Sequence, residues 1–579
     1  MEGSRTDFVV RLAGESGEGV LSLGEMLTTA LARLGYEVYT FRTYPAEIKG
    51  GTVLYQVRVA DHVLLSYGSR VDVFVALNEE GYRDNIGSLR AGGTLIYDSD
   101  SVSVPELPDT CVIPIPIGTI AKKEIGSVLT KNVVALGAIL RYIGAPVEVG
   151  EQIAEQTFKR KGEEVVQKNF QALHAGYNYI SQYTECLKPL LGGIEEVNPN
   201  RLIINGNEAL ALGALHGGLS FYAGYPITPA TDIMEALAPV LPRFGGVVIQ
   251  AEDEIAALGM VLGAAYAGKR AMTATSGPGF SLMVEQINLA AQAEIPAVIV
   301  DVQRGGASTG LPTKTAQGDL NIALYGVHNE SPRVVMAPTS VEDCFYLIQH
   351  ALNIAERYQL PVIVLSDQSL AHRRCTIPKP DLSLVPRWER IAPEPGTNGE
   401  YARYAITETG ISPVAVPGMP GLAYTATGIE HNEFGDPTYT PENLQAMKGK
   451  RFRKLQHLGE HYAEQFVRIW GEPEGAEVGI IGWGSSEGVI REAMQLAERE
   501  GVRAAALYPK MLMPLPVKMI EEFASKVKKV LVPERNFTGE FAAYLRSQTN
   551  VHPISYAKDT GLPFDPEEIK EEIIRVARM

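Results

Sequence analysis

The feature that most constrains the fold is a repeated pattern of a short apolar run, a glycine- or serine-containing turn and a stretch with helical apolar spacing. Apolar runs occur in the first part of the chain at 8–12, 36–41, 52–59, 71–77 and 93–98. Others occur later at 246–250, 271–275, 297–302 and 361–367, and again from residue 477 onwards. Near-continuous apolar strands that alternate with helices, as in the second group, indicate a parallel sheet buried between helices. The pattern therefore predicts an α/β fold.

Changes in composition divide the chain into three such domains. With 579 residues the chain is long enough for three or four. We predict an α/β domain at 1–190, a Gly- and Pro-containing linker at 191–200, a second α/β domain at 201–390 and a third at 471–579. The connection at 391–470 begins without periodicity and ends in a basic stretch, KGKRFRKLQHL (448–458), which we interpret as a solvated helix face.

Composition also excludes several classes of protein. The chain has 52 Lys and Arg against 68 Asp and Glu, a net charge of −16 that argues against nucleic-acid binding. No apolar run is long enough for a membrane span and none resembles a signal peptide, so we expect a cytoplasmic protein with no membrane partner. The four cysteines are far apart, which argues against disulfides and against a metal or iron–sulfur site in this chain: Cys111, Cys186, Cys344 and Cys375.

The stretch FYAGYPITPATDIMEAL (221–237) places a stiff loop before a helix. Pro226 and Pro229 fix φ and remove two backbone donors, so the segment from Tyr225 to Pro229 is expected to be extended. Thr231 is predicted to be the N-cap of the following helix. Hydroxyls at a helix N-terminus suit a polar or anionic ligand. An ordinary strand-to-helix turn is the open alternative.

Two further strand ends carry groups suited to ligand binding. In QAEDEIAALG, Glu254 stands immediately before a close-packing helix, so its carboxylate is expected over the carboxyl edge of the sheet; helix capping is the alternative. In DVQRGGASTGLPTKTAQGDL (301–320), Arg304 can bind a carboxylate with two N–H groups, and hydroxyls follow at Thr309 and Thr313. We expect this loop to contact a ligand.

Other motifs are incomplete. The loop ESGEG (15–19) only partly matches a dinucleotide-binding turn, and its glutamates would repel a phosphate. GAAYAGKR (263–270) has P-loop glycine spacing but lacks the Ser or Thr that holds Mg²⁺, and it is predicted to be helical. GSSEG (484–488) matches a nucleophile turn formally, in a domain too small for that fold. Lys49, before Gly50, could meet an anion or simply precede a tight turn.

Together these stretches resemble one family, the α subunit of the 2-oxoacid:ferredoxin oxidoreductases with a γ domain fused at its N-terminus. The residues that carry the resemblance are GYPITPATDIMEAL, AEDEIAALGMVLGAAYAGKRAMTATSGPGFSLM, QRGGASTGLPTKTAQGDL, GIEHNEFGDPTYTPENL with KRFRKL, and GWGSSEG. The combination is most similar to the 2-oxoglutarate type. It implies a γ-type domain, a pyrimidine-binding-type thiamine enzyme domain and a transketolase C-terminal-like domain, in that order.

The resemblance implies an enzyme subunit. The family oxidatively decarboxylates a 2-oxoacid with coenzyme A and passes electrons to ferredoxin; here 2-oxoglutarate would give succinyl-CoA, and the reverse direction would fix CO2, as in a reductive TCA cycle. Pyruvate or branched-chain 2-oxoacids are alternative substrates. A scaffold subunit without catalysis, a self-contained thiamine decarboxylase and an NAD-dependent dehydrogenase are alternatives of other kinds.

The resemblance also implies a divided active site. Thiamine diphosphate would be shared with a β subunit that holds Mg²⁺ and a [4Fe–4S] cluster, in an (αβ)2 heterotetramer. The sequence agrees, because it has neither clustered cysteines nor the GDG motif that binds the metal and diphosphate of thiamine enzymes.

Individual residues acquire roles from the resemblance. Glu254 matches the glutamate that bonds the pyrimidine N1′ of thiamine, and Thr228 would lie near the thiazolium and the substrate carbonyl. Arg304 would bind the substrate carboxylate. The remaining candidates are Tyr225, Thr309 and Thr313 for substrate, Pro226 for the cofactor, and Lys49 and Gly50 for coenzyme A.

Overall fold

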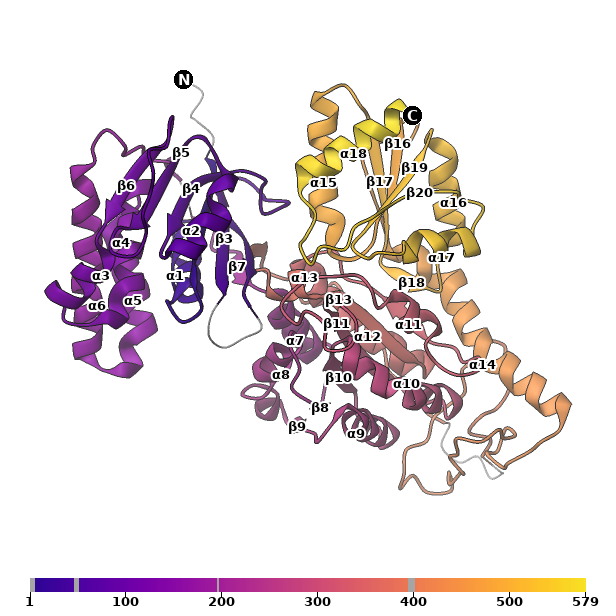
Figure 1. Ribbon diagram of the computed structural model, residues 1–579. Helices are drawn as coiled ribbons and strands as arrows, with labels where there is room; N and C mark the ends of the chain where they lie inside the picture. Colours follow the sequence, from indigo (N-terminus) through magenta and orange to yellow (C-terminus); the bar gives the residue numbers. More distant parts are fainter. Residues whose placement is uncertain (1–5, 46–50, 195–196, 394–400) are drawn as a thin grey trace. The chain divides into compact units, whose positions relative to one another are not determined.

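The computed structural model describes residues 6–45, 51–194, 197–393 and 401–579, and its strands there form three sheets (Figure 1). Chain contacts group these residues into two compact units, 1–204 with 373–379 and 205–372 with 380–579. The α/β fold class predicted from the apolar runs is confirmed. The domain boundaries drawn from composition stay a prediction.

The first unit is built on a mixed eight-stranded sheet. Its strands, in spatial order, are β6 (Cys111–Ile115), β5 (Leu89–Asp98), β4 (Val71–Ala76), β1 (Asp7–Glu15), β3 (Thr52–Ala60), β2 (Glu37–Thr43), β14 (Cys375–Pro378) and β7 (Arg201–Ile204). Its main helices are α1 (Val20–Arg33), α2 (Glu79–Asn85), α4 (Lys131–Ile143), α5 (Val147–Phe158) and α6 (Glu163–Tyr179). One apolar core joins β1 and β3 to α1 and α4, as the alternation of apolar runs and helical stretches requires.

The last two strands at one end of this sheet, β14 and the edge strand β7, come from distant parts of the sequence. Thr376 of β14 pairs with Ile203 of β7, and Cys375 pairs with Tyr39 of β2. Neither of these two strands appears among the predicted strands, because a four-residue strand is too short to show a period. The chain therefore leaves the first unit after β7 and returns to it after residue 372.

The second unit contains a seven-stranded sheet that is parallel except at one edge. Its order is β18 (Met511–Met513), β12 (Val334–Met336), β13 (Pro361–Asp367), β11 (Ala297–Gln303), β10 (Ala271–Thr275), β8 (Phe221–Gly224) and β9 (Val247–Gln250). Its helices are α7 (Gly206–His216), α8 (Thr231–Leu237), α9 (Glu254–Tyr266), α10 (Gly277–Gln292), α11 (Leu320–Tyr325), α12 (Val341–Tyr358) and α13 (Gln368–His372). The predicted parallel sheet is confirmed.

The C-terminal part of the same unit adds a five-stranded sheet, drawn in yellow in Figure 1. Its order is β15 (Val467–Trp470), β17 (Ala504–Pro509), β16 (Val478–Ile481), β19 (Val530–Glu534) and β20 (Ile554–Ala557). It is flanked by α15 (Glu487–Arg499), α16 (Val517–Lys526), α17 (Glu540–Gln548) and α18 (Pro566–Arg578). Strand β18 leaves this region to pair with β12, and one apolar core spans both sheets. The two sheets therefore pack as one body.

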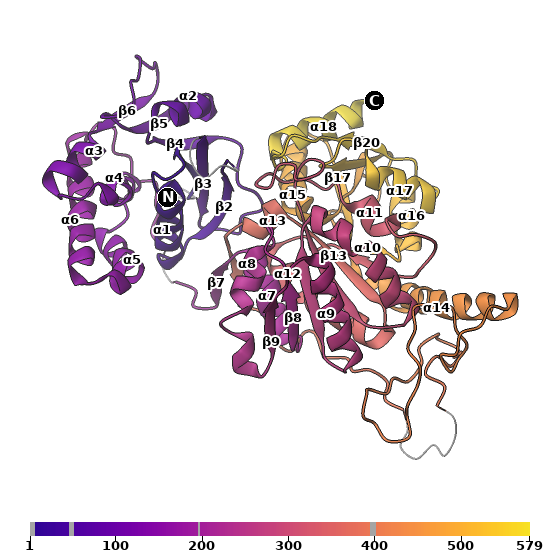
Figure 2. The ribbon, with the colours of Figure 1, turned by 60° about the horizontal axis from the view of Figure 1, so that its bottom comes forward.

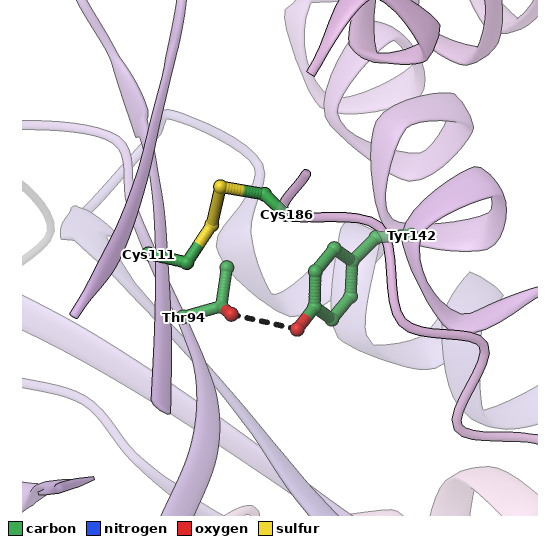
Figure 3. The surroundings of a disulfide bond; sticks show 4 residues. All are labelled: Thr94, Cys111, Tyr142 and Cys186. Atoms are coloured by element: carbon green, nitrogen blue, oxygen red, sulfur yellow. Dashed lines mark hydrogen bonds between the residues drawn. A yellow bond between two sulfur atoms is a disulfide. The ribbon is translucent and has the colours of Figure 1, made fainter. Parts of the chain in front are cut away.

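The expectation that no disulfide forms is wrong. Cys111, at the start of β6, is bonded to Cys186, which lies 75 residues later (Figure 3). Beside the bond, Thr94 is hydrogen-bonded to Tyr142 at 2.6 Å (Figure 3). The hydroxyl of Tyr183, three residues before Cys186, donates to the Pro114 carbonyl at 3.1 Å. Sequence spacing could not show the pairing, because folding of the intervening helices brings the segment after α6 against the edge strand.

The interpretation of the basic stretch as a solvated helix face is also wrong. Helix α14 (Pro441–Tyr462) buries Lys450 and Lys454 completely, and both ammonium groups contact the equally buried carboxylate of Glu294. Burial lowers the pKa of Lys450 to about 8 and that of Lys454 to about 7. Burial alone would raise the pKa of Glu294, but the two lysines hold it below its usual value. These charges fasten α14 to the end of α10.

Of the helices in the described residues, none is both long enough and apolar enough to cross a membrane.

Candidate functional site

The candidate site lies where four neighbouring parallel strands end. Strands β9, β8, β10 and β11 are adjacent and run in the same direction, so their carboxyl ends share one edge of the sheet. Strands β8 and β9 and helix α9 lie side by side in both Figure 1 and Figure 2. Ligands of open α/β sheets bind at this edge. The sequence-predicted residues Thr228, Glu254 and Arg304 all follow these strand ends.

The loop that follows β8 is held in place by a hydrogen bond from helix α7. The buried amide of Asn207 in α7 donates to the Pro229 carbonyl at 2.7 Å. Thr231 was predicted to be the N-cap of α8, but it is the first residue of the helix. The N-cap is Ala230, whose side chain cannot accept a hydrogen bond. The Ile227 carbonyl accepts from both of these backbone amides, at 2.8 and 3.1 Å, so the turn itself satisfies them.

This anchoring leaves part of the loop accessible. Tyr225 is 42% exposed, Thr228 is exposed and Pro226 is half-buried. A fixed loop with accessible groups can bind a ligand without first becoming ordered.

Glu254 is the first residue of α9 and is only 5% exposed. Glu254 does not cap the helix. Its neighbour Asp253 does, because the Asp253 carboxylate accepts a hydrogen bond from the Ala256 amide at 2.7 Å. The Glu254 carboxylate receives no hydrogen bond from any residue that the structure describes. Neither carboxylate oxygen is completely enclosed, so a ligand at this edge can reach the acceptor and donate a hydrogen bond to it. Glu254 is therefore placed to accept a hydrogen bond from a ligand.

Gly279 leaves the space that this carboxylate occupies. A Cβ at Gly279, in the first turn of α10, would lie 2.3 Å from Glu254 Oε1 and 2.1 Å from Thr275 Oγ1. Both distances are far below a normal contact, so only glycine fits while Glu254 keeps this position. The predicted strand–glycine–helix turn thus brings the backbone of α10 against the carboxylate.

Arg304 directly joins two of the predicted loops. Its Nη1 donates to the Thr228 carbonyl at 2.8 Å and its Nη2 to the Thr309 carbonyl at 2.8 Å. Burial lowers the pKa of Arg304, and the nearby carboxyls of Asp319 and Asp301 oppose that shift. The backbone carbonyls hold the guanidinium in one orientation, which is what recognition of a carboxylate requires.

The loop that follows Arg304 folds back on itself. The Gly305 amide donates to the Lys314 carbonyl at 2.9 Å, and the Leu311 amide donates to the Gly305 carbonyl at 2.6 Å. Thr309 is exposed at the tip, whereas Thr313 is 6% exposed. The predicted hydroxyls therefore belong to one small hairpin.

Two carboxyls beside Arg304 were not predicted. Asp301 is fully buried in β11, in register with Thr275, and burial together with the neighbouring Asp319 raises its pKa well above the usual value. Burial raises the pKa of Asp319 to about 6. An aspartate inside the apolar run AVIVDV was the available sequence signal, since charged residues are rarely fully buried without a partner.

The remaining predicted residues lie elsewhere. Lys49 and Gly50 lie outside the described residues. In the ESGEG loop the Glu18 carboxylate accepts from the Glu15 amide at 2.8 Å, so the loop already holds an anion of its own. Ser486 of the GSSEG turn is 2% exposed and donates to the Trp483 carbonyl at 2.9 Å, which does not fit a nucleophile. Among the described residues no three His, Cys, Asp or Glu side chains gather as a metal site.

Comparison with family models covers most of the chain. Residues 212–449 match "Pyruvate flavodoxin/ferredoxin oxidoreductase, thiamine diP-bdg". Residues 9–179 match "Pyruvate ferredoxin/flavodoxin oxidoreductase", and residues 476–561 match "Pyruvate:ferredoxin oxidoreductase core domain II".

Individual proteins are similar over the full length. The "2-oxoglutarate oxidoreductase subunit KorA" of Mycobacterium tuberculosis is 38% identical, over 97% of this chain and 90% of its own. The "2-oxoacid:ferredoxin oxidoreductase 2, subunit alpha" of Aeropyrum pernix is 31% identical over 98% of each. The solved "2-oxoglutarate:ferredoxin oxidoreductase from Magnetococcus marinus with 2-oxoglutarate, coenzyme A and succinyl-CoA bound" is 43% identical, with a TM-score of 0.94 over 99% of this chain and 100% of the other.

Proposed function

Because the chain belongs to the family of 2-oxoacid:ferredoxin oxidoreductase α subunits, we propose that it is the α subunit of an enzyme that oxidises 2-oxoglutarate. In the reaction, 2-oxoglutarate and coenzyme A give succinyl-CoA and CO2, and two electrons pass to ferredoxin. The names of the similar proteins favour 2-oxoglutarate over pyruvate or branched-chain acids. Glu254 and Arg304 both stand at the ligand-binding edge, which argues against a scaffold subunit.

The observation that carries the proposal is the buried residue Glu254, whose carboxylate accepts no hydrogen bond within the described part of the chain. Thiamine diphosphate, when bound, supplies the carbanion chemistry at the 2-oxoacid carbonyl. Glu254 fits its pyrimidine ring, because a carboxylate accepts a hydrogen bond from a ring N–H and can hold a proton there. Gly279 supports this assignment because it leaves the space that the carboxylate occupies.

Arg304 would bind the carboxylate of the 2-oxoacid. Each Nη carries two N–H groups, and the structure engages one bond at each Nη with the carbonyls of Thr228 and Thr309. The other N–H groups remain for a ligand. Thr228 and Tyr225 on the adjacent loop, with Thr309 and Thr313 on the hairpin, would add donors, and Pro226 would keep the adjacent loop rigid.

A β subunit would complete the site. After Glu254, helix α9 carries no charged side chain, yet Ile255 is 46% and Met260 39% exposed. Gly263 lies on the same face with no atom within 4 Å of an added Cβ, so the space beside it is open. An apolar face that a partner helix can approach closely is typical of a subunit interface. The partner would bring Mg²⁺, the diphosphate site and a [4Fe–4S] cluster, in an (αβ)2 assembly.

Coenzyme A would bind at the first unit, where Lys49 and Gly50 are the proposed contacts. The cytoplasmic location and the lack of nucleic-acid and membrane partners stay predictions from the sequence.

The test is anaerobic co-expression with a β subunit, followed by viologen reduction that depends on coenzyme A. 2-Oxoglutarate, pyruvate and 2-oxoisovalerate are compared in parallel. We expect activity to require both chains, to favour 2-oxoglutarate and to fall at least 100-fold in Glu254→Gln. Glu252→Gln, which changes an exposed carboxylate two residues away, is the matched control and should keep the wild-type rate. An assembled complex that is inactive with every 2-oxoacid would contradict the proposal.

A further inference from the structure

The loop that follows Arg304, residues 305–317, is called the Arg304 hairpin below. Its second half is bound to residues of the C-terminal sheet region. Gln317 is fully buried, and its amide donates to the Arg535 carbonyl at 2.7 Å. Its side chain donates to the Trp483 carbonyl at 3.0 Å and accepts from the Arg535 amide at 3.1 Å. The Asn536 amide group donates to the Gln317 carbonyl at 3.0 Å. One residue of the hairpin is thus bound on backbone and side chain to residues near the ends of β16 and β19.

The Arg535 side chain extends this attachment. Its guanidinium is buried, with Nη1 donating to Thr315 Oγ1 at 2.8 Å and Nη2 donating to Asp367 Oδ2 at 2.6 Å. Ser485 completes the cluster, because its hydroxyl donates to the same Asp367 oxygen at 2.6 Å. Asp367 ends β13, and its other oxygen accepts from Thr315 Oγ1 at 3.3 Å. Arg535, Asp367, Thr315 and Ser485 form what we call the anchor cluster.

Short links connect the anchor cluster to Arg304. Thr315 directly follows Lys314, whose carbonyl accepts from the amide of Gly305 at 2.9 Å. Gly305 in turn directly follows Arg304, whose guanidinium reaches the Thr228 carbonyl. Fixing Thr315 therefore fixes the return strand of the hairpin, the base of Arg304 and the loop that Arg304 holds.

The partners of Arg535 separate this arrangement from simple domain packing. Its guanidinium contacts three groups: Thr315, Asp367 and the Ser485 hydroxyl, which lies 2.6 Å from Nη2. Thr315 and Asp367 belong to the part with the seven-stranded sheet, and Thr315 lies on the hairpin itself. Buried charge-assisted bonds hold geometry well because each is short and directional, and leaving one partner unpaired is costly.

We propose that Arg535 is a positioning residue for substrate binding. Through the anchor cluster it sets where the Arg304 guanidinium stands, although it touches neither substrate nor cofactor. The C-terminal sheet thereby determines affinity for the 2-oxoacid carboxylate. This inference rests on the proposed function, which assigns Arg304 to that carboxylate.

The kinetic test uses the complete αβ complex. Arg535→Lys keeps a charge for Asp367 but cannot reach Thr315 as well, so we expect KM for 2-oxoglutarate to rise about tenfold while kcat changes less than about twofold. Ser485→Ala should raise KM about threefold. Ser486→Ala removes a hydroxyl of equal burial that bonds Trp483 and Tyr508 but no residue of the hairpin, and it should leave KM unchanged.

Amide hydrogen exchange of the full chain gives a readout that needs no activity. In Arg535→Lys we expect the peptide covering 305–317 to exchange at least about tenfold faster, while peptides from α15 and α18 keep their wild-type rates. If Arg535→Lys fails to fold, Ser485→Ala against Ser486→Ala decides the question.

The outcomes separate the two proposals. A wild-type complex that is inactive with every 2-oxoacid would contradict the proposed function. In that case amide hydrogen exchange of the peptide 305–317 would still show whether Arg535 positions the hairpin. Unchanged hairpin exchange in a folded Arg535→Lys, or a KM equal to wild type, overturns the positioning role. Equal KM effects of Ser485→Ala and Ser486→Ala overturn it too.

Discussion

Replacing Gly279 by alanine tests whether the position of Glu254 controls catalysis. The added Cβ would lie 2.3 Å from Glu254 Oε1 and 2.1 Å from Thr275 Oγ1. Carbon and oxygen atoms rarely approach closer than about 3.3 Å, so the carboxylate must move by about 1 Å. A shift of that size in a reacting group can reduce the rate about 100-fold. We therefore expect Gly279→Ala to lose about 100-fold of the viologen-reducing activity of the αβ complex.

The same change should affect stability much less than activity. Overpacking a buried site costs about 1–3 kcal/mol, while alanine in place of a helical glycine contributes about 1 kcal/mol in the opposite direction. The net loss of unfolding free energy should therefore be about 2 kcal/mol or less, measured by urea denaturation of the chain. Most of the activity loss would then come from geometry and little from unfolding.

Gly449→Ala is the matched control. Gly449 also lies in a helix, α14, but it is exposed and an added Cβ would meet no atom within 4 Å. This variant should gain up to about 1 kcal/mol of stability and keep full activity. Activity of Gly279→Ala within threefold of wild type would refute the reasoning, because the carboxylate would then be free to move without loss.

Four further predictions concern stability. Glu294→Gln leaves two buried ammonium groups without a carboxylate and should lower the unfolding free energy by about 3–5 kcal/mol in urea denaturation. Lys454→Met leaves one lysine paired with Glu294 and should lower it far less. Equal losses in the two variants would contradict this account of the charges. Because the pKa values of Lys450 and Lys454 are lowered in the folded state, the unfolded chain binds more protons than the folded chain from about pH 7 to 10.5. The stability of the wild type should therefore rise with pH in that window relative to Lys454→Met. Parallel stability profiles of the two proteins would contradict this prediction. The raised pKa of Asp319 means that the folded state binds more protons between about pH 4 and 6, so its titration should lower wild-type stability by up to about 3 kcal/mol as pH rises through that range. The fall should be smaller in Asp319→Asn, where only the buried Asp301 keeps a raised pKa, and equal falls in the two proteins would contradict the assignment. The Cys111–Cys186 bond closes a loop of 75 residues, so its reduction should destabilise the first unit by about 2–4 kcal/mol in thermal unfolding. The reductant should have no effect on Cys111→Ser. A thermal unfolding midpoint of the wild type that does not change on reduction would contradict a stabilising bond.

The sequence alone determined the features that depend on local order along the chain. Apolar runs between helical stretches determine that the chain forms buried sheets, and a residue that directly follows a parallel strand must lie at its carboxyl edge. This is why Glu254 and Arg304 could be identified as candidates before their neighbours were known, whereas Thr228 was named from the family resemblance. Two prolines within four residues likewise determine a stiff loop wherever that loop is placed.

The tertiary structure alone decided which distant groups meet. Lys454 looks like a surface residue by composition, yet it is buried against Glu294, 160 residues earlier in the chain. The bond between Cys111 and Cys186, the return of β14 to the first sheet and the contact of Arg535 with Asp367 are of the same kind. Helical or strand periodicity reports only which face of an element is buried. The partner on that face depends on how the sheets and helices stack, and that is settled only when the whole chain has packed.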